Sequence, residues 1–162
     1  MKTKGLRLYG KNDLRLEEFE LPRLREDEIL ARVVTDSICM STYKMVIQGE
    51  GHRRVPKGIK TNPIMVGHEF CGEMLEIGEK WKNKYKQHGK FTIQTALNKK
   101  ENPYAAPGFS YPYIGGTATY VIIPNEVMEL GCLQPYNGPT FFHSSLSEPM
   151  SCITGAFHAF YH

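Results

Sequence analysis

Apolar and polar residues alternate along several short stretches of the chain, and this alternation predicts β-strands. Residues 14–17 (Leu-Arg-Leu-Glu) show the period of two that is typical of a half-buried strand. Residues 29–34 carry apolar side chains on both faces of such a strand, so we expect this segment to be covered on both sides. Pro22 and the charged run 23–28 separate these two strands as a solvated turn. The same reasoning predicts further strands over residues 70–77, 91–93 and 120–123.

Residues 98–113 and the end of the chain depart from this strand pattern. The first segment is rich in Pro, Tyr, Asn and Gly and has no periodicity, so we expect a long surface loop. The second begins with Ser147, which can cap a helix, and has Pro149 in the expected first turn. Apolar side chains then recur with the spacing of an amphipathic helix, at Ile153, Ala156, Phe157 and Phe160. Short strands separated by Gly and Pro predict a barrel-like, mainly β domain with a few helices.

The composition is that of an ordinary globular domain. The 162 residues are enough for one domain with its own hydrophobic core. The net charge of +3 is too small to indicate a nucleic acid or membrane partner. The N-terminal lysines are not followed by the apolar run of a signal peptide, and no run reaches the length of a membrane span, so we expect a cytoplasmic protein. There the four cysteines, which include no CxxC pair, would remain thiols.

Three positions carry side chains that could bind a metal ion. They are Cys39 after residues 29–34, His68 and Glu69 before residues 70–77, and Glu148 at the start of the predicted helix. A catalytic zinc takes three such ligands and keeps a fourth position open. Spacing alone does not show whether these residues bind one metal ion, because the positions are far apart in the sequence. A cysteine at a strand end can be a small buried hydrophobe, and a glutamate in a first helical turn can serve the helix dipole.

Five segments, in order, resemble the signature sequences of the zinc-dependent medium-chain alcohol and polyol dehydrogenases. Residues 38–42 (ICMST) resemble the CGTD segment, 63–72 (PIMVGHEFCG) the PxxxGHExxG segment, and 88–91 (HGKF) the GDRV segment. Residues 115–124 (GGTATYVIIP) are similar to GGFAEYVVVP, and 148–152 (EPMSC) to EPLSC. Within the family, the segments look most similar to the branch of sorbitol dehydrogenase and sorbose-1-phosphate reductase. The resemblance implies a GroES-like, partly open β-barrel.

This resemblance also implies roles for individual residues. Cys39 and His68 would bind one catalytic zinc together with Glu69 or Glu148, either of which can be the direct ligand or hold the zinc water. The open position would take the oxygen of the substrate, and Ser41 would pass the alcohol proton outward, since a hydroxyl both donates and accepts. The substrate would be a small alcohol, polyol or sugar phosphate. Hydride would go to NAD or NADP bound by another domain.

The sequence departs from the family pattern at several positions. Thr42 stands where the family has an aspartate that orients the ligating histidine, so zinc would bind more weakly or another carboxylate would substitute. Lys44 stands where some members have a relay histidine; it could contact the cofactor or be solvated. Arg53 and Arg54 belong to a basic stretch that could hold a substrate phosphate or be a solvated loop. Residues 91–115 contain no cysteine, so we expect no structural zinc.

The nucleotide-binding half of the family is not recognisable, because no GxGxxG turn follows a strand. We therefore expect residues 1–146 to form the zinc-binding catalytic domain and residues 147–162 to begin the helix leading to an absent Rossmann domain. As such a fragment the chain would be inactive alone, and the full-length protein would be an NAD(P)-dependent, homo-oligomeric oxidoreductase. The alternatives are a non-catalytic GroES-like binding module and a zinc-free member of the quinone-reductase type.

Overall fold

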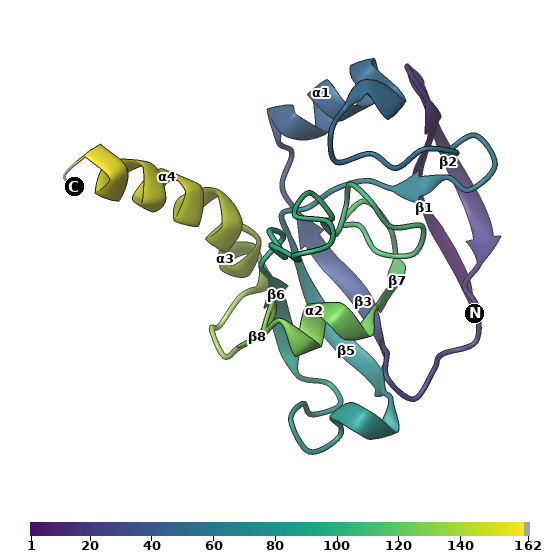
Figure 1. The fold of residues 1–162 in the computed structure, drawn as a ribbon. Coiled ribbons are helices and arrows are strands. Elements are labelled where there is room, and N and C mark those ends of the chain that lie inside the picture. Colours follow the sequence, from purple (N-terminus) through teal and green to yellow (C-terminus); the bar gives the residue numbers. More distant parts are fainter. Residues whose placement is uncertain (161–162) are drawn as a thin grey trace.

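Two antiparallel β-sheets form the body of the protein in the computed structural model, which describes residues 1–160 (Figure 1). The first sheet has the strand order β2-β1-β4 and the second the order β7-β3-β5-β6-β8. An isolated bridge between Gly5 and Ala118 links the two sheets, which do not close into a barrel. The architecture is therefore the open, mainly β fold expected from the sequence.

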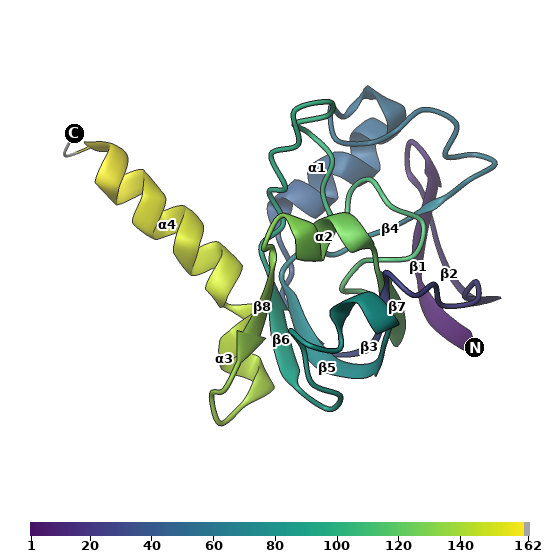
Figure 2. The ribbon, with the colours of Figure 1, turned by 60° about the horizontal axis from the view of Figure 1, so that its bottom comes forward.

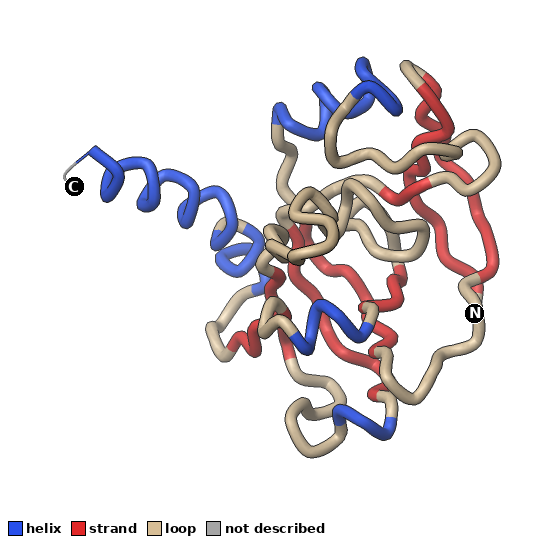
Figure 3. The backbone as a smooth tube through the Cα atoms, in the orientation of Figure 1, coloured by secondary structure: helices blue, strands red, loops and turns tan. Residues whose placement is uncertain are grey.

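Helices and 3-10 turns lie around these sheets, most of them in the connections between strands (Figure 3). The strands are β1 (Lys2–Gly10), β2 (Asp13–Glu20), β3 (Ile29–Asp36), β4 (Ile64–Met65), β5 (Phe70–Ile77), β6 (Lys90–Ile93), β7 (Tyr120–Ile123) and β8 (Leu133–Tyr136). The helices are α1 (Met40–Gln48), α2 (Asn125–Glu129), α3 (Phe141–Ser145) and α4 (Ser147–Phe160), and the 3-10 turns are η1 (Gly49–Gly51) and η2 (Glu79–Trp81).

The strands predicted from alternation are confirmed, and several other elements were missed. The predicted segments correspond to β2, β3, β5, β6 and β7, with β2, β3 and β6 longer than expected. Strand β1 was missed because the buried side of its first half carries Thr3 and Gly5 rather than apolar residues. Helix α1 was missed because its nine residues include Thr, Tyr, Val and Ile, which have low helix propensity.

The expectation that residues 29–34 are covered on both faces was wrong. Ile29 and Ala31 are fully buried, whereas Arg32 and Val34 are exposed. Arg32 Nη2 instead lies 2.8 Å from Glu73 Oε2 on the neighbouring strand β5, so the outer face of the sheet carries an ion pair. Strand β3 is therefore buried on one side, as antiparallel strands often are.

Residues 98–113 contain no helix or strand, as expected, but they are not simply a surface loop. Ala105, Ala106 and Phe109 are buried, and Phe109 packs in the smaller of two hydrophobic clusters. The predicted solvated turn over residues 23–28 also has a buried member, Glu28, whose carboxylate lies 3.0 Å from Arg25 Nη2. Phe109 turns inward through packing with distant apolar residues, whereas Glu28 is held by the local contact with Arg25, three residues earlier.

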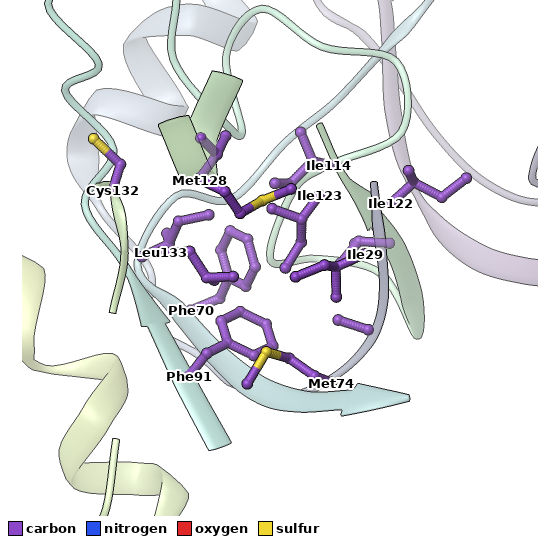
Figure 4. Packing of buried hydrophobic residues seen from close by; sticks show 14 of the residues in the cluster. Ile29, Phe70, Met74, Phe91, Ile114, Ile122, Ile123, Met128, Cys132 and Leu133 are labelled. Carbon is purple, nitrogen blue, oxygen red and sulfur yellow. The ribbon is translucent and has the colours of Figure 1, made fainter. Parts of the chain in front are cut away.

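The larger hydrophobic cluster fills the space inside the five-stranded sheet (Figure 4). The rings of Phe70 and Phe91 meet edge to face with centroids 6.1 Å apart, and Ile123 and Met128 are fully buried in the same cluster. Burying one such side chain stabilises the fold by about 1.5–3 kcal/mol. This packing makes the start of β5 a rigid support.

The smaller cluster fixes α1 against the other side of the link between β4 and β5. Met45 of α1 is fully buried beside Leu8, Ile64 and Val66. Val66 thus belongs to the smaller cluster and Phe70 to the larger one. Residues 67–69 cross from one cluster to the other and are anchored at both ends.

Helix α4 extends away from the body of the protein (Figures 1 and 2). The predicted helix from Ser147 is confirmed, and its apolar side chains are exposed, with Phe157 at 62% and Phe160 at 88%. None of the helices in the described chain is long and apolar enough to cross a membrane. The expected domain limits at residues 146 and 147 stay a prediction, and residues 161–162 lie outside the part that is described.

The contact between β3 and β5 at Gly72 leads to a first prediction. A Cβ at Gly72 would overlap the carbonyl oxygen of Arg32, and neither strand backbone can move aside without breaking its pairing. We expect Gly72→Ala to lower the free energy of unfolding by about 3 kcal/mol or more in urea titrations. The matched control is Gly10→Ala, because a Cβ there meets nothing within 4 Å; its effect should stay within about 0.5 kcal/mol. Equal stability of the two variants would contradict the prediction.

Candidate metal centre

Cys39 lies at the start of α1, three residues after the end of β3. It occupies the N-cap position, with φ −106° and ψ 142°, and its carbonyl oxygen accepts a hydrogen bond from the Thr42 amide at 3.0 Å. The N-terminus of a helix carries partial positive charge, which interacts favourably with a negative sulfur atom. The fold therefore presents Cys39 in a position suited to a thiolate ligand.

His68 and Glu69 lie in the link between β4 and β5. The preceding Gly67 has φ +91°, a conformation that glycine adopts readily and other residues avoid. A Cβ at Gly67 would approach Asp36 Oδ2 to 2.5 Å. The carbonyl oxygen of Gly67 accepts a hydrogen bond from the Gly116 amide at 2.8 Å. Thr95 Oγ1 donates to the carbonyl oxygen of His68 at 2.8 Å. These contacts fix the backbone of the link. They also explain on steric grounds why the Gly-His-Glu sequence begins with a glycine.

The structure brings Cys39, His68 and Glu69 together. One ligand atom from each of them lies within 4.8 Å of the others, and His68 Nε2 is 3.8 Å from Glu69 Oε1. Zinc bonds of about 2.0–2.3 Å in a tetrahedral site would place ligand atoms about 3.3–3.8 Å apart. A thiolate, an imidazole and a carboxylate are also the ligand types that zinc accepts. The three residues therefore fit a zinc ion after small adjustments.

Ser41 lies directly beside these ligands. Its hydroxyl oxygen is 2.9 Å from Cys39 Sγ and 3.1 Å from His68 Nε2. Ser41 is placed there because it sits in the first turn of α1, two residues after Cys39. A hydroxyl in this position can exchange a proton with a molecule bound next to His68.

His68 is held as a neutral imidazole. Burial lowers its pKa from 6.5 to about 4; the nearby Glu69 charge opposes this shift and the Arg54 charge adds to it. Thr42 Oγ1 lies 3.3 Å from Nδ1, so a hydrogen on Nδ1 can be donated to that hydroxyl. Nε2 then keeps its lone pair for a metal ion. Thr42 thus contacts the ring nitrogen that the family's aspartate would orient, but it does so without a charge.

The two candidate glutamates differ in their surroundings. Glu69 is buried, and its Oε2 accepts a hydrogen bond from Ser37 Oγ at 2.6 Å, which leaves Oε1 facing His68. Glu148, in the first turn of α4, is outside the three-residue group. Its pKa is raised mainly by burial and further by the charge of Glu69, while a contact with Cys152 opposes the shift. Glu148 therefore lies next to the site.

A cavity of about 220 Å³ opens beside His68. Its lining includes Ser41 and Glu148 as well as Arg53 and Arg54, the two residues that the sequence marked for substrate binding. The side chain of Lys44 is exposed on α1 and does not line this cavity. Ser41, His68, Glu148 and the two arginines thus share one cavity, Cys39 and Glu69 lie behind it with their ligand atoms close to that of His68, and Lys44 lies apart.

Thr95, Ala96 and Phe109 also line the cavity, although the sequence did not mark them as candidate residues. The ring centroid of Phe109 is 4.5 Å from that of His68 and 5.9 Å from that of His52. All three residues belong to segments without a metal-ligand motif or a clear periodicity. The repeated aromatic and Pro residues of 98–113 could have drawn attention to Phe109, and no signal in the sequence indicates Thr95 or Ala96. Their importance comes from packing between distant parts of the chain.

Asp36, at the end of β3, is half-buried, and its carboxylate is packed between Gly67 and Gly116. Added Cβ atoms at either glycine would collide with its oxygens, and Oδ1 has no hydrogen-bond partner among residues 1–160. Burial raises its pKa from 3.8 to about 7; backbone hydrogen bonds from Glu69 and Ser37 oppose the shift, and the Glu69 charge adds to it. Asp36 therefore supports the link that carries His68.

Comparison with known proteins gives a consistent result. The family described as "Alcohol dehydrogenase GroES-like domain" matches residues 25–131. L-sorbose 1-phosphate reductase of Klebsiella pneumoniae is 54% identical over 99% of this chain, which covers 39% of that protein. Mannitol-1-phosphate 5-dehydrogenase of Aliivibrio fischeri is 44% identical over 96% of this chain, which covers 36% of that protein. The chain thus spans less than half the length of these oxidoreductases.

A solved structure supports the same assignment. The fold is similar to that of 2R,3R-butanediol dehydrogenase from Bacillus subtilis, with a TM-score of 0.71 and 26% identity. The similarity covers 91% of this chain and 44% of the other. The resemblance drawn from the five sequence segments is confirmed.

The raised pKa of Asp36 predicts a pH-dependent stability. Because the folded protein holds this proton up to about pH 7 and the unfolded chain loses it near 3.8, the contribution of Asp36 declines as the pH rises between these values. Relative to Asp36→Asn, the wild type should lose about 2–3 kcal/mol of unfolding free energy between pH 5 and pH 7.5. Urea titrations with a chelator present would measure this difference.

The exposed Asp13, whose pKa is lowered by its hydrogen bonds with Arg15, provides the control for this experiment. Asp13→Asn should show the same pH dependence as the wild type. A constant difference between wild type and Asp36→Asn at both pH values would show that Asp36 does not titrate in this range.

Proposed function

The chain belongs to the family of alcohol dehydrogenase GroES-like domains, and on this basis we propose that it forms the zinc-binding catalytic domain of an NAD(P)-dependent oxidoreductase. The reaction interconverts an alcohol, a polyol or a sugar phosphate with its carbonyl form. The observation that carries the proposal is the convergence of Cys39, His68 and Glu69 beside a cavity.

Cys39, His68 and Glu69 would hold the zinc ion, with Glu148 next to them. The chemistry that zinc supplies when bound is Lewis acidity toward an alcohol or carbonyl oxygen. The neutral state of His68 favours binding, since an imidazole must be unprotonated to be a ligand. Thr42 keeps the His68 ring oriented through Nδ1.

Ser41 is proposed to move the proton. It lines the cavity, and its hydroxyl is 3.1 Å from His68 Nε2, where the reacting oxygen of a substrate would lie. The hydroxyl can accept the proton of a substrate alcohol while donating its own outward. Glu148 also lines the cavity, and its raised pKa makes it suitable to receive a proton there.

The proposed substrate and cofactor are inferred from the proteins to which this chain is similar. The proteins with 54% and 44% identity are named as a sugar-phosphate reductase and a sugar-alcohol-phosphate dehydrogenase, which supports a phosphorylated or free polyol as substrate. We propose that NAD or NADP binds to the part of the longer protein that this chain does not span, with Lys44 as a contact. The full-length protein would be a cytoplasmic homo-oligomer without a structural zinc. The 162-residue chain alone is then expected to lack hydride transfer.

Metal binding tests the proposal directly. We expect the purified chain to bind about one zinc per molecule, and Co²⁺ in its place to give a thiolate-to-metal absorption band. Cys39→Ala should remove both the bound metal and the band. Cys132→Ala is the matched control, because Cys132 is buried away from the site and should leave metal binding unchanged. Full zinc content in Cys39→Ala would make the assignment wrong.

The two glutamates provide a second test. Because Glu69, unlike Glu148, lies in the group of converging ligand atoms, we expect Glu69→Gln to weaken zinc binding by more than about 100-fold. Glu148→Gln should weaken it by no more than about tenfold, as expected for a neighbour of the ligands. Competition with a chromophoric chelator measures both affinities. The reverse order would assign Glu148 as the direct ligand.

A further inference from the structure

The cavity beside His68 has a basic side formed by His52, Arg53 and Arg54. These three consecutive residues line the same space as Ser41 and His68. Burial decreases along this lining, because His68 is buried, Arg54 is half-buried and Arg53 is exposed. One molecule in the cavity can therefore touch the metal-binding end and the basic end together.

The two arginines are held in place by aromatic rings rather than by carboxylates. The Arg53 guanidinium carbon lies 5.1 Å from the Tyr104 ring centroid, and that of Arg54 lies 5.5 Å from the Phe109 centroid. Arg54 Nη1 donates to the carbonyl oxygen of Tyr104 at 3.2 Å. Within residues 1–160 neither guanidinium forms an ion pair with a carboxylate. Their charge is oriented and remains available for an anion.

The positive charges on the basic side of the cavity also favour the binding of an anion. The pKa of Arg54 is lowered by burial and by the neighbouring Arg53 charge, while the Glu148 charge opposes the shift. The pKa of His52 is lowered by burial and by both arginines. An anionic ligand would relieve this repulsion, because it interacts favourably with both guanidinium groups.

His52 adds a neutral donor to this side of the cavity. Its Nδ1 accepts the backbone N–H of Arg54 at 3.3 Å, so the neutral ring carries its hydrogen on Nε2. Two guanidinium groups and one N–H donor match the several acceptor oxygens of a phosphate monoester. Ser110 Oγ donates to the Arg54 carbonyl oxygen at 2.7 Å and ties this segment to residues 98–113.

We propose that His52, Arg53 and Arg54 form a phosphate-binding subsite that makes this domain select phosphorylated polyols or ketoses over the free sugars. The phosphate lies at the basic end of the cavity and the reacting carbon at the end of Ser41 and His68. This inference rests on the proposed function, because the reacting end is the proposed zinc site. A phosphate monoester also occurs in NADP, as the 2′-phosphate, but the shared lining with His68 favours the substrate.

Binding of matched ligand pairs to the zinc-loaded chain tests the subsite. We expect sorbitol 6-phosphate to bind at least about tenfold more tightly than sorbitol in calorimetric titrations, since charge-assisted hydrogen bonds contribute most of the difference. Arg53→Gln with Arg54→Gln should remove this preference and leave zinc content unchanged. Adenosine 2′-phosphate and adenosine, titrated in parallel, should show no preference that depends on the two arginines.

The matched control removes two other positive charges from the same segment, by Lys57→Gln with Lys60→Gln. Neither lysine lines the cavity, and Lys57 Nζ donates to the Glu50 carbonyl oxygen at 2.8 Å. This control should keep the preference for sorbitol 6-phosphate. If the lysine variant lost this preference, the preference would depend on the overall positive charge of the segment rather than on the arginines, and the proposal would be overturned.

Three further outcomes would overturn the subsite: equal binding of sorbitol 6-phosphate and sorbitol by the wild type, a preference that survives in the arginine variant, or an arginine-dependent preference for adenosine 2′-phosphate alone. Zinc content is measured separately. A chain that binds no zinc but keeps the arginine-dependent preference would contradict the proposed function and leave the phosphate subsite standing.

Discussion

The close approach of three backbone segments around Asp36 is the constraint on which the site depends. The end of β3, the link that contains Gly67, and the segment that contains Gly116 meet so tightly that a Cβ at either glycine would collide with the Asp36 carboxylate. This contact brings the strand that leads to Cys39 beside the link that carries His68. The position of two candidate ligands therefore follows from the size of two glycines and the burial of one acidic group.

The energetic cost of this arrangement is a concentration of acidic side chains, of which Glu69 is buried and Asp36 and Glu148 are half-buried. Burial raises the pKa of Asp36 and of Glu148, and the charge of Glu69 adds to both shifts. A divalent cation among these groups would offset the repulsion, whereas the nearby Arg54 charge does so only in part. The cavity next to these groups is lined by two guanidinium groups, and neither forms an ion pair with a carboxylate within the described residues. The cavity thus joins His68 and Ser41 to two guanidinium groups, which suits a small molecule that carries a reacting hydroxyl and an anionic group.

The sequence pattern predicted much of the framework and all three of the residues that converge as candidate ligands. Strands β5 and β7 were predicted with their limits, because their apolar residues are contiguous or β-branched and are bounded by Gly and Pro. Helix α1, by contrast, was not recognised, since its stability comes from burying Met45 against β1 rather than from its own residues. The irregular composition of residues 98–113 predicts only a surface loop. Phe109 nevertheless packs against His68, a contact that no local pattern indicates.

The sequence by itself determined the residue types, their order, and the glycines that permit close backbone contacts, and these were sufficient to identify the family. Tertiary structure alone decided that Cys39, His68 and Glu69 converge, that His68 is neutral, and that Arg53 and Arg54 share a cavity with Ser41. The physical reason is that short-range order depends on neighbouring residues, whereas burial and electrostatic coupling depend on groups brought together from distant positions.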